Sequence, residues 1–262
     1  MSNEGEQKVA LITGASSGLG RAIAERLAQS GWIAGLVARR RDRLEALARD
    51  IETRGGRAHV IVGDLRDRAF AAEVVDALVA RTGRLDLLVN NAGAPTPAID
   101  RGTWEVATDD AFDDAFALNV RAMYRLSHDA LPHLRATRGS IVNVGSAGVA
   151  ANLPIDLVYL ASKGAVEVMS QGMARKWAPL GVRVNVVSPG LVPTEIFQAA
   201  GLSEDAARTE IARAIGTLQP LPRMGRAEDV ASAVAYLASD AAAFVTGAVL
   251  AVDGGMGVGG AS

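Results

Sequence analysis

The sequence predicts an α/β protein in which one doubly wound parallel sheet of seven strands carries helices on both faces. Two observations predict this class. Short apolar runs alternate with stretches of helical spacing along the whole chain, the order that gives βαβ units. Hydrophobic residues make up 49% of the 262 positions but aromatic residues only 4%, as expected when strands are apolar on both faces and packed by aliphatic side chains.

Seven runs are expected to be strands, because each is short, apolar and rich in β-branched residues. They are residues 9–13, 33–38, 59–62, 85–90, 140–144, 182–187 and 248–252. The stretches between them have the spacing of helices, at residues 19–29, 44–53, 70–81, 112–134, 157–178 and 229–237. Right-handed crossovers of this length place each helix against the sheet and keep the strands parallel.

Residues 1–262 are expected to form a single domain, because the chain contains no repeat, linker or break in composition. Two segments depart from the alternating pattern. Residues 191–222 belong to a proline-containing insertion with a short helical piece at 204–215, and long irregular segments of this kind often form substrate loops. Residues 254–262 form a glycine-rich tail.

Charge and composition exclude several classes of protein. The formal net charge of −2 gives no reason to expect nucleic acid or an anionic membrane as a partner. The absence of cysteine excludes disulfides and cysteine nucleophiles, and the three histidines (His59, His128 and His133) lack metal-ligand spacing, so no metal is expected. Residues 1–7 do not resemble a signal peptide, and no run reaches the roughly 18 apolar residues of a membrane span. We expect a cytoplasmic protein.

A glycine-rich loop follows the first expected strand, and a helix begins directly after it. On a Rossmann-type sheet this context favours a dinucleotide, whose pyrophosphate binds at the helix N-terminus. One glycine allows the tight turn, the second lets the backbone approach the pyrophosphate, and the third allows close packing of helix on strand. An ordinary tight turn is the alternative. The expected contacts are Gly14, Ser16, Ser17, Gly18, Leu19 and Gly20.

The end of the second strand bears on the choice of nicotinamide cofactor. An acid there would bind the ribose 2′-hydroxyl of NAD, whereas a base would pair with the 2′-phosphate of NADP. This strand is followed by Arg39-Arg40-Arg41 and no acid, so NADP(H) is favoured and NAD(H) remains possible. Arg39 is the first choice for the phosphate contact and Arg40 the second; a solvated charge run is the alternative. Asp64 and Leu65 follow the third strand, where Asp64 could bind the adenine or simply cap a turn.

Four polar residues form a candidate catalytic set. Tyr159 and Lys163 are four residues apart on an expected helix and therefore share a face. Ser146 follows the fifth strand, and Asn119 lies on the preceding long helix. A Tyr/Lys pair at this spacing is usually surface decoration, but its occurrence with a phosphate loop on the same sheet favours a functional site.

In these residues and in several further motifs the chain resembles the short-chain dehydrogenase/reductases, most closely the 3-oxoacyl-acyl-carrier-protein reductase branch. The resemblance covers nearly the whole chain. One departure is Gly145, where the family often has serine. The matching motifs are Thr13–Gly20, Asn90-Asn91-Ala92-Gly93, Asn119, Ser146, Tyr159-Leu160-Ala161-Ser162-Lys163, Pro189-Gly190, Thr194 and Val252-Asp253-Gly254-Gly255.

The resemblance implies a mechanism for hydride transfer between nicotinamide and a carbonyl or alcohol carbon. Tyr159 would be the general acid in reduction and the base in oxidation. Lys163 and the oxidised nicotinamide, both cations, would lower the pKa of Tyr159 from about 10 to roughly 7–8. Ser146 would donate a hydrogen bond to the substrate oxygen. Asn119 would hold a water that relays protons to Lys163, or would make only a structural bond.

The resemblance also implies further contacts and an assembly. Lys163 would also bind the ribose hydroxyls of the nicotinamide. The residues that would line the cofactor are Asn91, Ala92, Gly93, Tyr159, Lys163, Pro189, Gly190, Val192 and Thr194. A mainly apolar substrate pocket is expected at Leu153, Ile155, Ile196, Phe197 and Leu202, which could equally pack the loop onto the body. The substrate stays open among a carrier-bound 3-oxoacyl thioester, a small ketone, a steroid and a polyol-derived ketone. A homotetramer would form through the helices at 112–134 and 157–178.

The sequence therefore predicts an NADPH-dependent carbonyl reductase or alcohol dehydrogenase. Three alternatives stay open. An NAD-dependent alcohol dehydrogenase is opposed only by the arginines after the second strand. A non-catalytic NADP-binding sensor is disfavoured because Ser146, Tyr159 and Lys163 are all present. An extended-type epimerase would need a different glycine spacing and a longer chain.

Overall fold

The computed structural model describes residues 7–96, 108–151, 153, 156–195 and 203–258. Its seven strands form one parallel sheet in the order β3-β2-β1-β4-β5-β6-β7, which confirms the predicted fold class. The strands are β1 (Val9–Thr13), β2 (Ile33–Ala38), β3 (Arg57–Val62), β4 (Leu87–Asn90), β5 (Ser140–Val144), β6 (Arg183–Pro189) and β7 (Val249–Val252).

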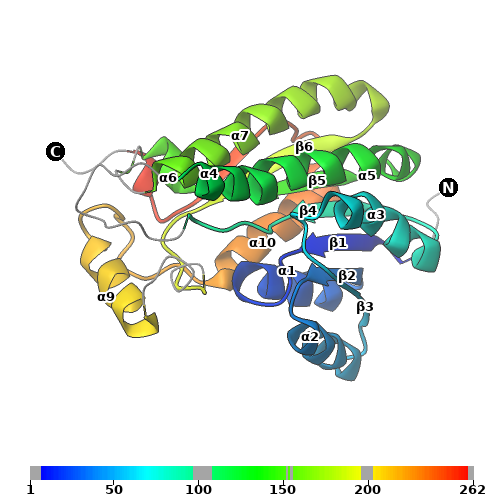
Figure 1. Ribbon diagram of the computed structural model, residues 1–262, viewed down its shortest axis with the longest axis horizontal. Coiled ribbons are helices and arrows are strands. Elements are labelled where there is room, and N and C mark those ends of the chain that lie inside the picture. The colour runs from blue at the N-terminus through cyan, green and yellow to red at the C-terminus, as the bar shows by residue number, and fades with distance from the viewer. Residues whose placement is uncertain (1–6, 97–107, 152, 154–155, 196–202, 259–262) are drawn as a thin grey trace.

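Helices cover both faces of the sheet (Figure 1). One face carries α1 (Gly18–Gln29), α2 (Arg41–Thr53) and α10 (Ala227–Ala238), and the other carries α3 (Arg68–Thr82), α4 (Asp109–Phe116), α5 (Met123–Thr137) and α7 (Leu157–Trp177). Two further helices, α6 (Ala147–Ala150) and α9 (Glu204–Ala214), lie toward the carboxyl ends of the strands. No helix in the described ranges is long and apolar enough to cross a membrane.

Local signals fix where the helices begin and end. The carboxylate of Asp67 accepts a hydrogen bond from the Ala69 amide at 2.8 Å and starts α3, because a side-chain acceptor satisfies an amide that has no partner in the first turn. Gly83 ends the same helix with a left-handed φ of 75°, which glycine adopts without steric cost. Ser203 caps α9 in the same way as Asp67 caps α3.

Most expected elements appear with ends shifted by one to three residues, but the helix expected at 112–134 is divided. It consists of α4, a π-helical turn called η1 (Ala117–Ala122), and α5. The turn contains Asn119, whose side chain bonds to Ala94 and Ser162 instead of facing solvent. A π turn inserts one residue into the helical repeat and often occurs at functional sites.

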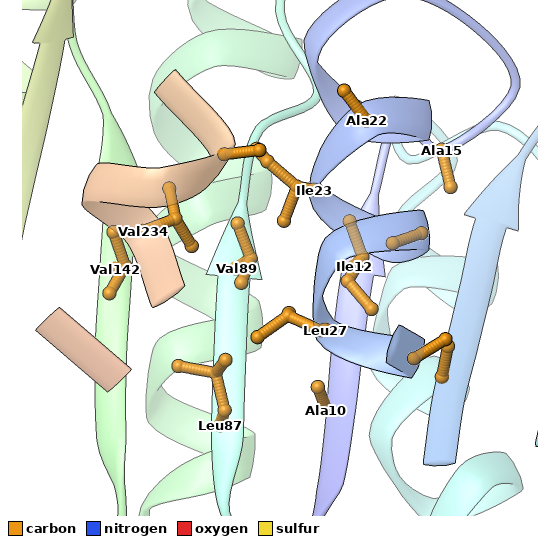
Figure 2. Close-up of a cluster of buried hydrophobic side chains, with 14 of the residues drawn as sticks. Ala10, Ile12, Ala15, Ala22, Ile23, Leu27, Leu87, Val89, Val142 and Val234 are labelled. Atoms are coloured by element: carbon orange, nitrogen blue, oxygen red, sulfur yellow. The ribbon is translucent and has the colours of Figure 1, made fainter. Parts of the chain in front are cut away.

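The apolar core forms two layers, one on each face of the sheet. Along β1, Ala10 and Ile12 point to the layer under α1 and α10, whereas Val9 and Leu11 point to the layer under α3, α5 and α7. Figure 2 shows the first layer, where Ile12 lies among Ile23 and Leu27 of α1 and the side chains of β4. Each such fully buried aliphatic side chain stabilises the fold by about 1.5–3 kcal/mol.

The strand order predicts a ligand-binding crevice at the carboxyl end of β1. From β1 the chain winds outward through β2 and β3, and later returns to add β4 on the other side of β1. The connections after β1 and β4 therefore diverge, and open α/β sheets bind their ligands where the connections diverge in this way. The glycine loop follows β1, and Asn90-Asn91-Ala92-Gly93 spans the end of β4.

Candidate active site

The glycine loop brings its backbone close to a neighbouring loop. Gly14 and Gly18 have φ values of +67° and +52°, which favour glycine. A Cβ on Gly20 would overlap the carbonyl oxygen of Gly14 and lie 2.5 Å from Asn91 Nδ2. The loop therefore requires glycine at these positions, and its amides lie at the start of α1 as an anion such as pyrophosphate needs.

Thr13 and Asn91 join the ends of β1 and β4. The Thr13 hydroxyl accepts hydrogen bonds from the amides of Asn91 and Ala92 at 2.9 and 3.0 Å, and donates one to the Val89 carbonyl at 3.2 Å. Asn91 Nδ2 donates to the Thr13 carbonyl at 2.8 Å. These bonds fix the glycine loop and the loop after β4 beside each other.

Arg40 is the arginine that contacts the glycine loop. Its guanidinium donates to Ser17 Oγ at 2.7 Å and to Ser16 Oγ at 2.9 Å. Arg39 points elsewhere, with a side chain 68% exposed and a 3.6 Å ion pair to Asp64. Arg40 therefore replaces Arg39 as the first candidate for a 2′-phosphate contact. Asp64 also accepts from the Arg66 amide at 3.0 Å, and Leu65 is buried.

Two residues that the sequence analysis did not single out complete this charged cluster. The Glu195 carboxylate accepts from Arg40 at 2.7 Å and also pairs with Arg43. Arg43 lies three residues after Arg40 at the start of α2, so helical spacing could have indicated it. Glu195 is more than 150 residues away along the chain, and no local pattern relates it to the arginines.

The four candidate catalytic residues come from three parts of the chain that meet at the carboxyl edge of the sheet: helix α7, the end of β5 and the turn η1. Tyr159 and Lys163 lie on α7, Ser146 follows β5, and Asn119 lies in η1. Lys163 Nζ donates to the Val144 carbonyl at 2.8 Å and lies 5.7 Å from the centre of the Tyr159 ring. Lys163 is only 4% exposed, so the packing around it fixes the position of its ammonium group.

Three hydrogen bonds fix the side-chain amide of Asn119. Its Nδ2 donates to Ser162 Oγ at 2.9 Å and to the Ala94 carbonyl at 3.0 Å, while its Oδ1 accepts from the Ala94 amide at 3.0 Å. A Cβ on Gly93 would lie 3.1 Å from Lys163 Nζ and 3.2 Å from Asn119 Oδ1. Gly93 thus leaves room for both side chains at one point.

The groups around Tyr159 and Lys163 shift both pKa values. Burial raises the pKa of Tyr159 to about 12, a hydrogen bond with Ser146 opposes this shift, and the negative charge of Asp156 adds to it. Burial lowers the pKa of Lys163 to about 8. The resemblance implies a lowered Tyr159 pKa when Lys163 and the oxidised nicotinamide act together. The chain's own groups do not lower this pKa, and they keep the phenol protonated as a proton donor requires.

Asp156 connects the catalytic helix with the β4 loop. It caps α7 by accepting from the Tyr159 amide at 2.9 Å, and its other oxygen accepts from the amide and hydroxyl of Thr96 at 2.6 and 2.5 Å. The sequence analysis missed both residues. An aspartate directly before the first helical residue is an N-cap signal, and it could have identified Asp156.

Position 145 has glycine where the resembling family often has serine, and the packing around it explains the difference. A Cβ on Gly145 would lie only 2.7 Å from Ser188 Oγ. Ser188 is buried on β6 and donates to Glu167 of α7 at 2.9 Å. In this chain the Ser188–Glu167 bond takes the space that a side chain at position 145 would need, so glycine fits there.

The remaining expected contacts lie around the same edge. Pro189 ends β6, Val192 is buried, and a Cβ on Gly18 would lie 3.2 Å from Thr194 Cβ. Of the expected substrate residues only Leu153 is described, and it is half-buried; Ile155, Ile196, Phe197 and Leu202 lie outside the described residues. Within the described ranges no three His, Cys, Asp or Glu side chains gather as a metal site would need.

Comparison with known proteins gives matches over nearly the whole chain. A family model described as enoyl-(acyl carrier protein) reductase matches residues 14–257. The 3-oxoacyl-[acyl-carrier-protein] reductase of Thermotoga maritima is 36% identical over 255 residues, which cover 96% of this chain and 98% of that protein.

Solved structures agree with this match. An actinorhodin polyketide ketoreductase variant solved with NADPH superposes with a TM-score of 0.85 at 32% identity, covering 96% of this chain and 97% of that one. The 3-ketoacyl-(acyl-carrier-protein) reductase of Brucella melitensis, complexed with NADH, superposes with a TM-score of 0.84 at 31% identity, covering 96% and 99%.

Proposed function

This chain belongs to the short-chain dehydrogenase/reductase family of oxidoreductases, and on that premise we propose that it is an NADPH-dependent carbonyl reductase. The same chemistry run in reverse is that of an alcohol dehydrogenase. The observation that carries the proposal is the meeting of Ser146, Tyr159 and Lys163 at the sheet edge that also bears the glycine loop.

The residues of the crevice fit a nicotinamide dinucleotide phosphate. The loop with Gly14, Gly18 and Gly20 would hold the pyrophosphate, because these glycines allow its tight turn and its close packing against neighbouring protein atoms, so that its amides lie at the start of α1. Arg40, fixed by Ser16 and Ser17, would pair with the 2′-phosphate. When bound, the reduced nicotinamide supplies hydride to the substrate carbon.

The chain's own groups supply the proton and bind the substrate oxygen. Tyr159, protonated because of its raised pKa, would donate its proton to that oxygen. Ser146 would donate a hydrogen bond to the same atom and stabilise the negative charge that develops on it. Lys163 would bind the cofactor ribose, while Asn119 and Ser162 hold the wall of the site next to Lys163.

The pH dependence of the rate follows from Lys163. We expect kcat/KM for NADPH to fall about tenfold per pH unit above about pH 8, because this ratio reports the free enzyme and deprotonation removes the lysine charge. Tyr159 stays protonated over the same range, since its pKa is about 12. A steady-state profile between pH 6 and 10 measures this, and a profile that remains flat throughout contradicts the role of Lys163.

The substrate class and the assembly extend the proposal. The similarity of this chain to 3-oxoacyl reductases makes a 3-oxoacyl thioester the first substrate class to test, ahead of small, steroid or polyol-derived ketones. A homotetramer is supported by exposed apolar side chains on the two helical regions expected to form it: Phe112, Tyr124, Leu157 and Val168. The cytoplasmic location remains a prediction.

The cofactor assignment is tested by titrating NADPH and NADH against wild type, Arg40→Ala and Arg39→Ala. We expect NADPH to bind wild type at least about tenfold more tightly than NADH, as a charge-assisted phosphate contact allows. Arg40→Ala should lose that margin and Arg39→Ala should keep most of it. Equal binding of both cofactors by wild type would favour the alternative NAD-dependent alcohol dehydrogenase.

A further inference from the structure

We propose that Glu195 is an internal competitor for the cofactor's 2′-phosphate, holding the arginine pair Arg40/Arg43 until that phosphate displaces it. The inference rests on the proposed NADP(H) function and extends it, since it names the residue that limits how strongly the phosphate is preferred. Glu195 lies in the connection after β6, and the arginine pair lies at the end of β2 and the start of α2.

The contacts of Glu195 are those that a phosphate at this position would make. One carboxylate oxygen accepts from Arg40 at 2.7 Å, and the other pairs with Arg43. Arg40 is held in place by Ser16 and Ser17, whose hydroxyl oxygens accept from it at 2.9 and 2.7 Å. Glu195 therefore sits on a positioned pair of guanidinium groups next to the glycine loop.

The charges of the cluster favour an anion with more charge than a carboxylate. Partial burial opposes ionisation of Glu195, but hydrogen bonds and charge from Arg40 and Arg43 outweigh it and hold its pKa below the ordinary value. The nearby Arg39 forms its ion pair with a different carboxylate, that of Asp64. Arg40 and Arg43 both pair with Glu195, so two positive charges face one negative charge. A phosphate monoester carries about 1.5 to 2 negative charges at neutral pH and offers three acceptor oxygens.

The ion pairs are also exposed enough to exchange. The side chains of Arg40, Arg43 and Glu195 are 39%, 45% and 42% exposed, and pairs in contact with solvent are weak because water screens them. An incoming phosphate can therefore displace the carboxylate. The apparent affinity for the phosphate is then the intrinsic affinity multiplied by the fraction of molecules in which Glu195 does not hold the arginines.

The test compares binding of 2′,5′-ADP and 5′-AMP by calorimetry, because these ligands differ only in the 2′-phosphate and need no turnover. Glu195→Gln keeps the size of the side chain and removes its charge. We expect this variant to bind 2′,5′-ADP about tenfold more tightly than wild type. This is the gain that follows if Glu195 leaves the arginines free in about a tenth of the wild-type molecules. Binding of 5′-AMP should change by less than about twofold, since it does not reach the pair.

Glu45→Gln is the matched control, because Glu45 lies on the same helix as Arg43 and pairs with Arg41 at 3.5 Å. It removes one negative charge near the site without freeing Arg40 or Arg43. We expect its affinity for both ligands to stay within about twofold of wild type. An increase equal to that of Glu195→Gln would mean that net charge alone is responsible and would overturn the proposal.

The other outcomes separate this inference from the proposed function. If wild type prefers 2′,5′-ADP and Glu195→Gln leaves that affinity unchanged or weaker, Glu195 does not compete and the inference fails while the NADP(H) assignment stands. If wild type shows no preference and the variant gains one, the assignment fails and the competitor role of Glu195 stands. If neither protein shows a preference, both are wrong.

Discussion

Tyr159→Phe is expected to lower kcat for carbonyl reduction by about 10³-fold, within the range that general acid catalysis contributes. Phenylalanine keeps the ring, which lies 5.7 Å from Lys163 Nζ, and removes only the proton donor. Loss of hydration raises the pKa of the half-buried phenol to about 12, so at neutral pH it carries the proton that the substrate oxygen needs. Steady-state kinetics with the best ketone substrate measures the loss.

Cofactor binding separates this effect from misfolding. The variant should bind NADPH within about twofold of wild type, because no contact to the glycine loop changes. Tyr236→Phe is the matched control, since Tyr236 lies on α10 and is 45% exposed, and it should keep full activity. If Tyr159→Phe retains more than about a tenth of the wild-type rate, another group donates the proton and the assignment is wrong.

Gly20→Ala is expected to abolish measurable NADPH binding, with a rise in Kd of at least about 100-fold, and to destabilise the fold by about 1–3 kcal/mol. The added Cβ would overlap the Gly14 carbonyl oxygen and lie 2.5 Å from Asn91 Nδ2. Neither atom can move away easily, because the Gly14 oxygen belongs to the backbone and Asn91 Nδ2 is hydrogen-bonded to the Thr13 carbonyl. Fluorescence titration and thermal unfolding measure the two effects.

Gly172→Ala is the control for the general effect of replacing a helical glycine. Nothing lies within 4 Å of a Cβ at Gly172, and alanine favours helix over glycine by about 0.5–1 kcal/mol. This variant should unfold at an equal or higher temperature and bind NADPH as wild type does. If Gly20→Ala binds NADPH normally, the glycine loop is not the cofactor site.

The sequence alone predicted the parallel sheet, because strand and helix periodicity alternate along the chain, and its motifs and family resemblance identified the candidate catalytic set. It did not predict the division of the helix at 112–134. That division depends on bonds from Asn119 to Ala94 and Ser162, which are distant in sequence. A continuous helical pattern contains no sign of the extra residue in a π turn.

The site was less predictable where it depends on side-chain direction. Arg39 and Arg40 are adjacent in the sequence, and only the fold shows that Arg40 turns to the glycine loop while Arg39 pairs with Asp64. Glu195 could not be identified because its partners lie in another segment. The direction of the Tyr159 pKa shift depends on burial and on Asp156, neither of which a motif reveals.

The central claim is that this protein transfers hydride from NADPH to a carbonyl carbon. It is tested most directly by incubating the full chain at high concentration with NADPH deuterated on one face of C4 and a panel of 3-oxoacyl thioesters and ketones. We expect deuterium in the alcohol product from one of the two C4 epimers and none from the other, because the site presents a single face of the ring. If NADPH binds but neither epimer delivers deuterium to any carbonyl of the panel, the protein is a nicotinamide-binding sensor and the enzymatic assignment is wrong.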